Sequence, residues 1–345
     1  MSLGTEALVS LQDKRGSKKP RIALYSHDTC GLGHMRRNVL IAQTLARPPL
    51  SADILLITGA REANAFPIPS GVDVLSLPAL FKQGNGRYRP RRFSFDVDEL
   101  IALRARTIRT ALEMFRPDVF IVDNVPRGAM GELNETLDFL HRHTSARCVL
   151  GLRDVLDHPQ TIAREWGRAD HFTAIRTSYH AVWIYGDPAV YDAAFAYHFP
   201  ADVTARLTYT GYLDQKTRLT LADIDTAAST LKDGPKRPFY LCAVGGGQDG
   251  LHLAERFAAT PLPDHTAGLI LTGPYMDPAA RRHLRHLGAA HPHLHLLPFT
   301  TEPMVLYQRA ERVVSMGGYN TVCELLSLGK RALIVPRIRP RREQL

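Results

Sequence analysis

The residues best suited to chemistry near the start of the sequence form a short loop, Gly-Leu-Gly-His, at positions 31–34. Gly31 and Gly33 allow the backbone to approach a ligand closely, and the helix expected from His34 onward would present free N–H groups to an anion. His34 stands where loop and helix meet, so its imidazole could remove a proton from a substrate near neutral pH. The same residue could instead cap the helix or lie in the core. The loop lacks the third glycine of the dinucleotide-binding fingerprint.

Two further glycine-rich turns lie in the C-terminal half of the sequence. Gly245, Gly246 and Gly247 follow an apolar run at 239–244 that predicts a strand, and a helix is expected at 251–259. A glycine-rich turn between a strand and a helix exposes backbone N–H groups, so this turn is a candidate phosphate cradle.

The other turn, residues 315–321, also leads from a predicted strand into a predicted helix. It contains Gly317, Gly318, Asn320 and Thr321, and Glu324 follows one turn inside the helix. The carboxylate of Glu324 could accept hydrogen bonds from a ribose diol. Alternatively, its charge only stabilises the helix start, by roughly 0.3–1 kcal/mol.

Glycine-rich turns of this kind lie between a strand and a helix, and the sequence predicts such an alternation of strands and helices along most of its length. Apolar runs of strand length lie at 22–26, 53–58, 72–77, 119–122, 147–151 and 182–185, and again at 239–244, 268–272, 294–297, 312–315 and 332–335. Helix-length amphipathic segments separate most of them, which indicates parallel sheets covered by helices on both faces. We therefore expect a disordered basic tail at 1–20, a doubly wound domain at 21–213, a linker at 214–237 and a second doubly wound domain at 238–345.

Ligands of such sheets bind outside the carboxyl ends of the strands. Asp123, Arg153 and Asp154 follow predicted strands of the first domain, so they are candidates for the acceptor side of a site. The alternative is that they cap helices and form an internal ion pair.

The composition narrows the class of protein. The 345 residues include four widely spaced cysteines, so we expect neither a zinc site nor disulfides, and a cytoplasmic setting. The net charge is +9, with basic runs at 87–92 and 337–342 that would suit an anionic membrane surface or a phosphorylated ligand. Aromatic residues are not interleaved as a nucleic-acid platform requires, so we expect no nucleic acid. The basic run at 87–92 could equally be a solvated loop.

Two patterns that could suggest a metal site have simpler explanations. Asp96 and Asp98 precede an amphipathic helix, and Asp96 with Glu99 resembles a capping box. His291, His293 and His295 alternate as one exposed strand face would. We expect no metal and no cofactor.

The segment Ser-Met-Gly-Gly-Tyr-Asn-Thr-Val-Cys-Glu at 315–324, the segment at 329–336 and Arg342-Glu343-Gln344 resemble the donor-site signature of MurG-like glycosyltransferases. That group includes the UDP-GlcNAc transferase of peptidoglycan synthesis. The loop at 31–34 is similar to the first glycine-rich loop of the group. Segments 116–123 and 150–157 resemble a narrower set of uncharacterised bacterial predicted glycosyltransferases, and this likeness runs from about residue 20 to the end.

The resemblance implies the GT-B architecture, in which two Rossmann-like domains face each other across a cleft. It implies that Glu324 binds the ribose, that Gly317 and Gly318 bind the diphosphate, and that Glu343 and Gln344 bind the donor sugar. It places His34 in the cleft near the acceptor. The candidate residues are thus His34 as catalytic base; Gly245, Gly246, Gly247, Gly317, Gly318, Asn320, Thr321, Glu324, Glu343 and Gln344 on the donor side; and Gly31, Gly33, Asp123, Arg153 and Asp154 on the acceptor side.

The function expected from these residues is inverting, metal-independent hexosyl transfer from a UDP-linked sugar to the hydroxyl of a sugar, lipid-linked or small-molecule acceptor. A lipid-linked acceptor would imply peripheral contact with the inner face of the membrane. The alternatives are a nucleotide-sugar hydrolase in which His34 activates water, a 2-epimerase, and a non-catalytic nucleotide-sugar-binding protein. Because the sequence stops at Leu345, directly after Glu343-Gln344, we expect either that the C-terminal helices of the architecture are truncated or that the cleft closes in a different way, which bears on catalytic competence.

Overall fold

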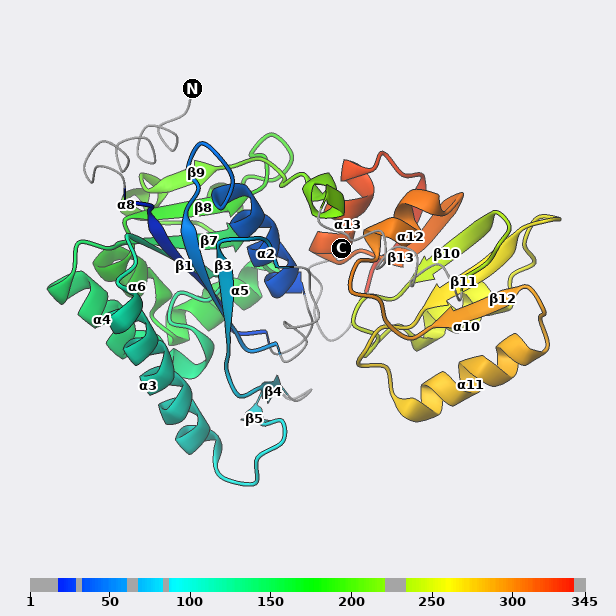
Figure 1. Cartoon of the computed structure of the whole chain (residues 1–345), viewed down its shortest axis with the longest axis horizontal. Helices are drawn as coiled ribbons and strands as arrows, with labels where there is room; N and C mark the ends of the chain where they lie inside the picture. Colours follow the sequence, from blue (N-terminus) through cyan, green and yellow to red (C-terminus); the bar gives the residue numbers. More distant parts are fainter. Residues whose placement is uncertain (1–17, 29–32, 61–67, 83–86, 221–233, 338–345) are drawn as a thin grey trace. The chain divides into compact units, whose positions relative to one another are not determined.

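The computed structural model describes residues 18–28, 33–60, 68–82, 87–220 and 234–337. The chain divides into two compact units, the first ending at Leu213 and the second beginning at Asp214. Each unit is built around its own parallel sheet, with helices on both faces (Figure 1). Within the described ranges, no helix is long and apolar enough to cross a lipid bilayer.

The first unit contains a seven-stranded sheet with the order β3-β2-β1-β6-β7-β8-β9. All neighbouring strands in it pair in parallel. The strands are β1 (Arg21–Ser26), β2 (Asp53–Thr58), β3 (Val72–Ser76), β6 (Val119–Asp123), β7 (Arg147–Arg153), β8 (Ala181–Tyr185) and β9 (Leu207–Tyr209). A separate antiparallel hairpin is formed by β4 (Leu80–Lys82) and β5 (Tyr88–Pro90).

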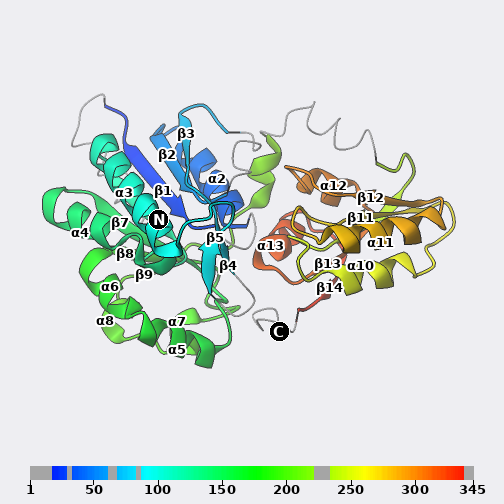
Figure 2. The same ribbon diagram turned by 90° about the horizontal axis from the view of Figure 1, so that it is seen from below.

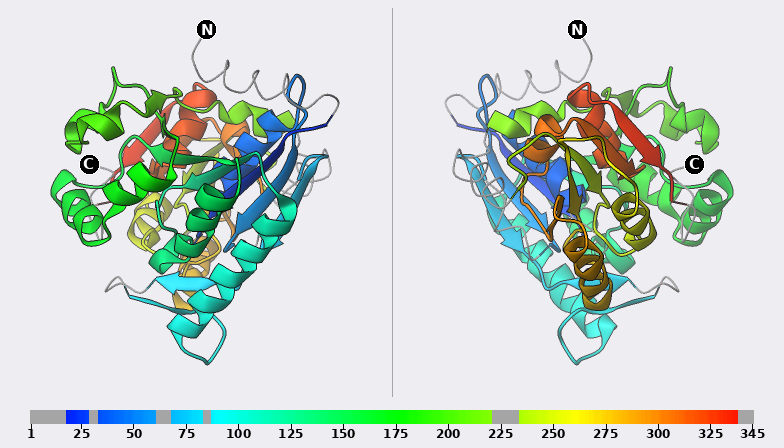
Figure 3. Two further views of the ribbon diagram at one scale, coloured as in Figure 1. Left: turned by 90° about the vertical axis from the view of Figure 1, so that its left-hand side faces the viewer. Right: turned by 90° about the vertical axis from the view of Figure 1, so that its right-hand side faces the viewer.

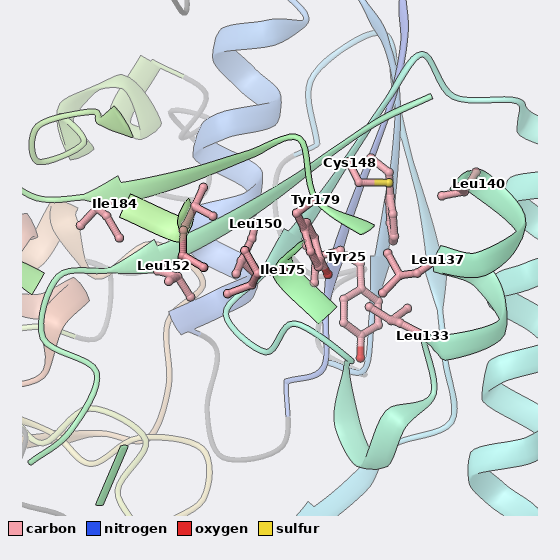
Figure 4. Packing of buried hydrophobic residues seen from close by; sticks show 14 of the residues in the cluster. Tyr25, Leu133, Leu137, Leu140, Cys148, Leu150, Leu152, Ile175, Tyr179 and Ile184 are labelled. Atoms are coloured by element: carbon pink, nitrogen blue, oxygen red, sulfur yellow. The ribbon is translucent and has the colours of Figure 1, made fainter. Parts of the chain in front are cut away.

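Helices of the first unit cover both faces of this sheet (Figure 3). They are α2 (Gly33–Leu45), α3 (Val97–Phe115), η2 (Ala129–Gly131), α4 (Asn134–His143), α5 (Pro159–Arg168), α6 (His171–Ser178), α7 (Ala193–Ala196) and α8 (Ala201–Thr204). Ala23 and Tyr25 of β1 pack in one cluster with residues of α3, α4 and α6, while the alternate residues Ile22 and Leu24 are also buried. Figure 4 shows part of that cluster, including Tyr25, Leu137 and Ile175.

The second unit contains a five-stranded parallel sheet with the order β12-β11-β10-β13-β14. Its strands are β10 (Phe239–Ala243), β11 (Ala267–Leu271), β12 (Leu294–Leu297), β13 (Arg312–Met316) and β14 (Ala332–Val335). Its helices are η3 (Gln215–Thr220), α10 (Leu251–Ala258), α11 (Pro278–Ala289), α12 (Met304–Arg309) and α13 (Tyr319–Ser327). Of these, η3 falls inside the segment expected to be a linker.

Alternate residues of β10, and Val244 directly after it, belong to two different cores. Leu241 and Ala243 pack with residues of α12 and α13, whereas Cys242 and Val244 pack with residues of α10 and α11. Figure 2 shows these helix layers on either side of the second sheet. A strand that is buried on both faces has to be continuously apolar. The prediction of two doubly wound α/β units is therefore confirmed.

In both sheets, the first strand along the chain lies in the interior, and later strands are added first on one side of it and then on the other, which reverses the strand order at that point. In the first unit, β2 and β3 extend the sheet on one side of β1 and β6 begins the other side; in the second unit, β11 and β12 lie on one side of β10 and β13 on the other. The loops after the two strands at such a reversal diverge, so a crevice for ligands forms at their carboxyl ends. The places to examine are thus the loops after β1 and β6 and the loops after β10 and β13.

Candidate active site

In the first unit, this strand reversal brings His34 and Asp123 together. His34 lies in the first turn of α2, directly after the loop that follows β1, and Asp123 is the last residue of β6. The His34 Nδ1 atom is 2.9 Å from Oδ2 of Asp123. The side chain of His34 is 26% exposed and that of Asp123 is fully buried. The pair is therefore a partly exposed imidazole backed by a buried carboxylate.

Arg37 also binds the carboxylate of Asp123. Its Nη2 atom donates to Oδ1 and Oδ2 at 2.7 and 2.8 Å, and its guanidinium lies over the ring of Tyr185, 5.3 Å from the ring centroid. Burial raises the pKa of Asp123, but the charges of Arg37 and His34 outweigh burial and lower this pKa to about 2. Asp123 is therefore an anion throughout the physiological range.

The proton on the imidazole of His34 is assigned from this network. Arg37 Nη2 lies 3.0 Å from His34 Nδ1, so Nδ1 could accept from Arg37 or donate to Asp123. Arg37 Nη2 is already bonded to both oxygens of Asp123, and a buried carboxylate is the stronger acceptor. We therefore place the proton on Nδ1, which leaves Nε2 as the basic nitrogen.

Asp28 holds the start of α2, the helix that carries His34. Its Oδ1 atom accepts from the backbone N–H of Met35 at 3.1 Å, and its Oδ2 atom accepts from the hydroxyls of Ser26 and Thr58 at 2.5 and 2.6 Å. Burial raises the pKa of Asp28. These contacts tie the start of α2 to the ends of β1 and β2, so His34 is held by the sheet.

The other residues predicted for the acceptor side have mixed placements. Asp123 forms an internal ion pair with Arg37, which is the alternative to an acceptor role that the sequence left open. Asp154 is buried, accepting from the hydroxyl of Tyr212 at 2.6 Å, and Arg153 Nη2 donates to the carbonyl of Leu156 at 2.7 Å. Gly33 begins α2, and Gly31 lies outside the described residues. An acceptor role for Arg153 and Asp154 stays a prediction.

In the second unit, the turn after β10 is built from glycines for steric reasons. Gly245 and Gly247 have φ angles of 61° and 93°. A Cβ atom on Gly247 would lie 2.2 Å from the carbonyl oxygen of Thr272, whereas a Cβ atom on Gly245 would meet nothing within 4 Å. Gly247 is therefore required for packing of the turn, and Gly245 borders open space.

The turn after the adjacent strand β13 also contains a glycine that borders open space. The hydroxyl of Ser315 donates to the carbonyl of Ala243 at 2.8 Å, which joins the ends of β13 and β10. A Cβ atom on Gly318 would meet nothing within 4 Å, and Gly318 is the N-cap of α13 without a side-chain cap. Asn320 has a buried Oδ1 atom with no hydrogen-bond partner among the described residues. The first turn of α13, with Asn320 and Thr321, thus offers backbone N–H groups beside open space, as an anion site requires.

Glu324 is more deeply buried than expected for a ligand-binding residue. It is 1% exposed, and its Oε1 atom accepts from Nη1 of Arg218 at 2.7 Å. Arg218 also donates to both carboxylate oxygens of Glu302, at 3.1 and 2.6 Å. Arg218 and Glu302 were not among the residues predicted for the site, because neither lies near a glycine-rich turn. Glu343 and Gln344 lie outside the described residues.

The basic run at 87–92 contacts an aromatic residue that lies outside the run, Phe81. The guanidinium groups of Arg89 and Arg91 lie over the ring of Phe81, 4.8 and 5.5 Å from its centroid. Phe93 stacks on Phe95 with 4.8 Å between ring centroids and is 49% exposed. Phe81 reaches these arginines from the opposite strand of the hairpin, so it was not visible within the basic run itself. The expectation of no nucleic-acid partner stays a prediction.

Comparison with known proteins finds a sequence match within the second unit. Residues 242–344 match the glycosyltransferase family 28 C-terminal domain. The matched residues of this chain include both glycine-rich turns and Glu324. No curated protein matches the sequence closely enough to count as a relative.

Solved structures extend the likeness to both units. The putative UDP-N-acetylglucosamine 2-epimerase from Listeria monocytogenes has a TM-score of 0.60 at 12% sequence identity. The superposition covers 94% of this chain and 81% of the epimerase chain. The UDP-GlcNAc 2-epimerase from Neisseria meningitidis, bound to UDP-GlcNAc, scores 0.57 at 15% identity, covering 94% and 84%. A UDP-glucosyltransferase from Polygonum tinctorium scores 0.58 at 12%, covering 95% and 82%. These likenesses establish the fold, so the predicted GT-B class is confirmed.

Proposed function

We propose that this protein is an inverting, metal-independent hexosyltransferase of the MurG-like type, using a UDP-linked sugar donor. The observation that carries the proposal is the contact between His34 and Asp123, a partly exposed base oriented by a buried anion at a strand reversal. A histidine held in this way has the features of a general base: a fixed tautomer, an accessible nitrogen and a carboxylate that stabilises the imidazolium.

In the proposed reaction, Nε2 of His34 takes the proton of the acceptor hydroxyl as its oxygen attacks the anomeric carbon of the donor sugar. The bond between that carbon and the diphosphate oxygen breaks, and its electron pair leaves with the nucleoside diphosphate. Attack from the face opposite the leaving group inverts the anomeric configuration. Asp123 acts through His34 and does not touch the acceptor, because its side chain is fully buried.

On the donor side, the glycine-rich turns of the second unit would receive the nucleotide. The N-terminus of α13, with Gly317, Gly318, Asn320 and Thr321, and the turn with Gly245, Gly246 and Gly247 would bind the diphosphate and stabilise its charge as it leaves. Glu324 would bind the ribose, and Glu343 with Gln344 the sugar. The match of this unit to a glycosyltransferase-family domain supports the assignment.

On the acceptor side, the first unit would supply Gly31 and Gly33 as close-approach backbone positions, and Arg153 and Asp154 as lining residues. The acceptor class we propose is a sugar, lipid-linked or small-molecule hydroxyl compound. Nucleic acid is not among the partners that we propose.

The same histidine could activate water in place of an acceptor, which would make the protein a nucleotide-sugar hydrolase. The experiment is to incubate UDP-GlcNAc and UDP-glucose with the protein, with and without a panel of acceptors, and to analyse UDP, free sugar and sugar product. UDP release that requires an acceptor supports transfer. UDP and free sugar released without an acceptor would show hydrolysis, a C2 epimer would show epimerisation, and binding without turnover would show a non-catalytic protein.

A cytoplasmic protein with peripheral membrane contact is part of the proposal. Exposed Arg87, Arg89 and Arg92, next to the half-exposed Phe93, combine positive charge with an apolar ring, which suits an anionic lipid surface. Flotation with vesicles of anionic lipid should decrease as salt rises from 50 to about 500 mM, because added ions screen the attraction. Flotation that does not depend on salt or lipid charge would refute this contact.

A further inference from the structure

The side chain of Arg218 lies at the centre of a buried cluster in the second unit. This Arg218 cluster comprises Gln215, Arg218, Glu302 and Glu324, drawn from η3, from the loop before α12 and from α13. Arg218 is 4% exposed. Its Nη1 atom donates to Glu324 at 2.7 Å and to Gln215 at 3.0 Å, while Nε and Nη2 hold Glu302. One guanidinium therefore fixes three segments of the chain.

The two carboxylates of the cluster are used differently. Glu302 accepts through both oxygens, since Oε1 binds Nη2 of Arg218 and the N–H of Met304, and Oε2 binds Nε of Arg218. Glu324 accepts through Oε1 from Arg218, and no described residue donates to its Oε2 atom. Glu324 therefore keeps one carboxylate oxygen uncommitted.

The charges in the cluster favour a ligand that donates hydrogen bonds. Two carboxylates share one guanidinium, so the cluster carries an excess of negative charge in a place with little water. Glu324 is 1% exposed, so its Oε2 atom has little access to water, and a ligand hydroxyl would give this oxygen a donor. The vicinal hydroxyls of a ribose are two such donors, and Glu324 lies on the helix whose N-terminus borders the open space at Gly318.

We propose that Arg218 is a positioning residue for nucleotide recognition: it fixes Glu324 through Oε1 and so presents Oε2 to the ribose hydroxyls. The inference rests on the proposed function, because it assumes that the second unit binds a nucleoside diphosphate. It adds a residue from the segment between the two predicted domains to the donor site.

The test compares binding of UDP and 2′-deoxy-UDP to the full-length protein by calorimetry. The wild-type protein should bind UDP roughly tenfold more tightly than 2′-deoxy-UDP, since a hydrogen bond to a charged group is lost in the deoxy compound. Arg218→Met should lower UDP affinity to the level of 2′-deoxy-UDP and leave 2′-deoxy-UDP affinity nearly unchanged. Arg218→Lys should retain part of the preference, because it keeps one donor to Glu324.

The control is Arg104 of the first unit, which is equally buried and donates from Nε and Nη2 to Glu132 at 2.6 and 2.8 Å. Arg104→Met should lower the melting temperature while the preference for UDP over 2′-deoxy-UDP stays at the wild-type value. If Arg218→Met does not fold, Gln215→Leu, which removes an acceptor of Nη1, should still reduce the preference two- to threefold.

The outcomes separate the two proposals. Wild-type protein that binds neither nucleotide would overturn the proposed function and this inference with it. Wild-type protein that binds both equally would overturn the ribose contact of Glu324, and with it the role of Arg218, while leaving nucleotide binding by the second unit in place. A folded Arg218→Met protein that keeps the wild-type preference would overturn the role of Arg218.

Discussion

The two strand reversals of this protein have the same topology and opposite chemistry. In the first unit, the start of α2 and the end of β6 bring His34, Arg37 and Asp123 into direct contact. In the second unit, the loops after β10 and β13 carry glycines, and two of these border open space. The difference between the two reversals is one of chemistry on a shared scaffold: the first holds a histidine backed by a buried carboxylate, and the second holds glycines beside open space. We propose that the first unit supplies the group that takes a proton and the second the backbone surface that binds the diphosphate.

The largest expected effect concerns the buried anion of the first unit. Asp123→Asn should lower turnover by about 10²–10⁴-fold, because the amide neither fixes the His34 tautomer nor stabilises the imidazolium. It should also cost about 3–5 kcal/mol of folding free energy, since Arg37 is left buried without its anion. Steady-state kinetics and urea unfolding measure the two effects.

The matched control is Glu132→Gln, which removes the anion of the buried Arg104 pair in the same unit. It should cause a comparable loss of stability and leave turnover of the folded protein within a factor of about three. A similar kinetic loss in both variants would mean that Asp123 acts only through stability.

The next effect distinguishes the glycines of the second unit. Gly247→Ala should destabilise the protein by roughly 2–4 kcal/mol, because of its positive φ angle and the nearby carbonyl of Thr272. Gly318→Ala has an allowed φ of −66° and open space, so it should change stability by less than about 0.5 kcal/mol. The same Gly318→Ala change should weaken UDP binding about tenfold if the diphosphate fills that space. Unchanged UDP affinity would remove Gly318 from the donor site.

A further effect, confined to acidic pH, is a dependence of stability on pH in the first unit. Burial and the charge of Arg127 lower the pKa of His171 from 6.5 to about 4. The unfolded chain therefore binds a proton below pH 6.5 that the folded protein does not accept until about pH 4, so stability falls across this window as pH falls. His171→Gln should flatten the fall in melting temperature between pH 6.5 and 4. An identical pH profile in both proteins would show that His171 does not contribute.

The sequence predicts the parts of this structure that depend on local pattern. Continuous apolar strands and glycine-rich turns predict both sheets and the position of His34 after β1. Contacts between distant residues were not predictable in this way. Arg218 lies 84 residues from Glu302 and 106 from Glu324, and nothing in the spacing of the three indicates a cluster. Arg37 had a usable signal, because it follows His34 by three residues and so shares its face of α2.

Glu324 shows a second limit of sequence reasoning. Its place one turn inside a helix predicts an accessible carboxylate near the ligand, yet it is 1% exposed and bound to Arg218. Burial of a residue on a short helix depends on what packs over it, and here that is η3, a segment whose sequence reads as a linker. The ribose role of Glu324 therefore depends on its second oxygen, which is the point that the Arg218 variants examine.

The division of tasks between the units can be tested most directly by measuring two quantities on one variant, His34→Ala. UDP affinity is measured by calorimetry, and donor turnover is measured with an accepted hydroxyl compound. The account predicts that turnover falls by about 10²–10⁴-fold while UDP affinity stays within twofold of the wild-type value. Turnover retained in His34→Ala, or a loss of UDP affinity that accounts for the lost turnover, would contradict it.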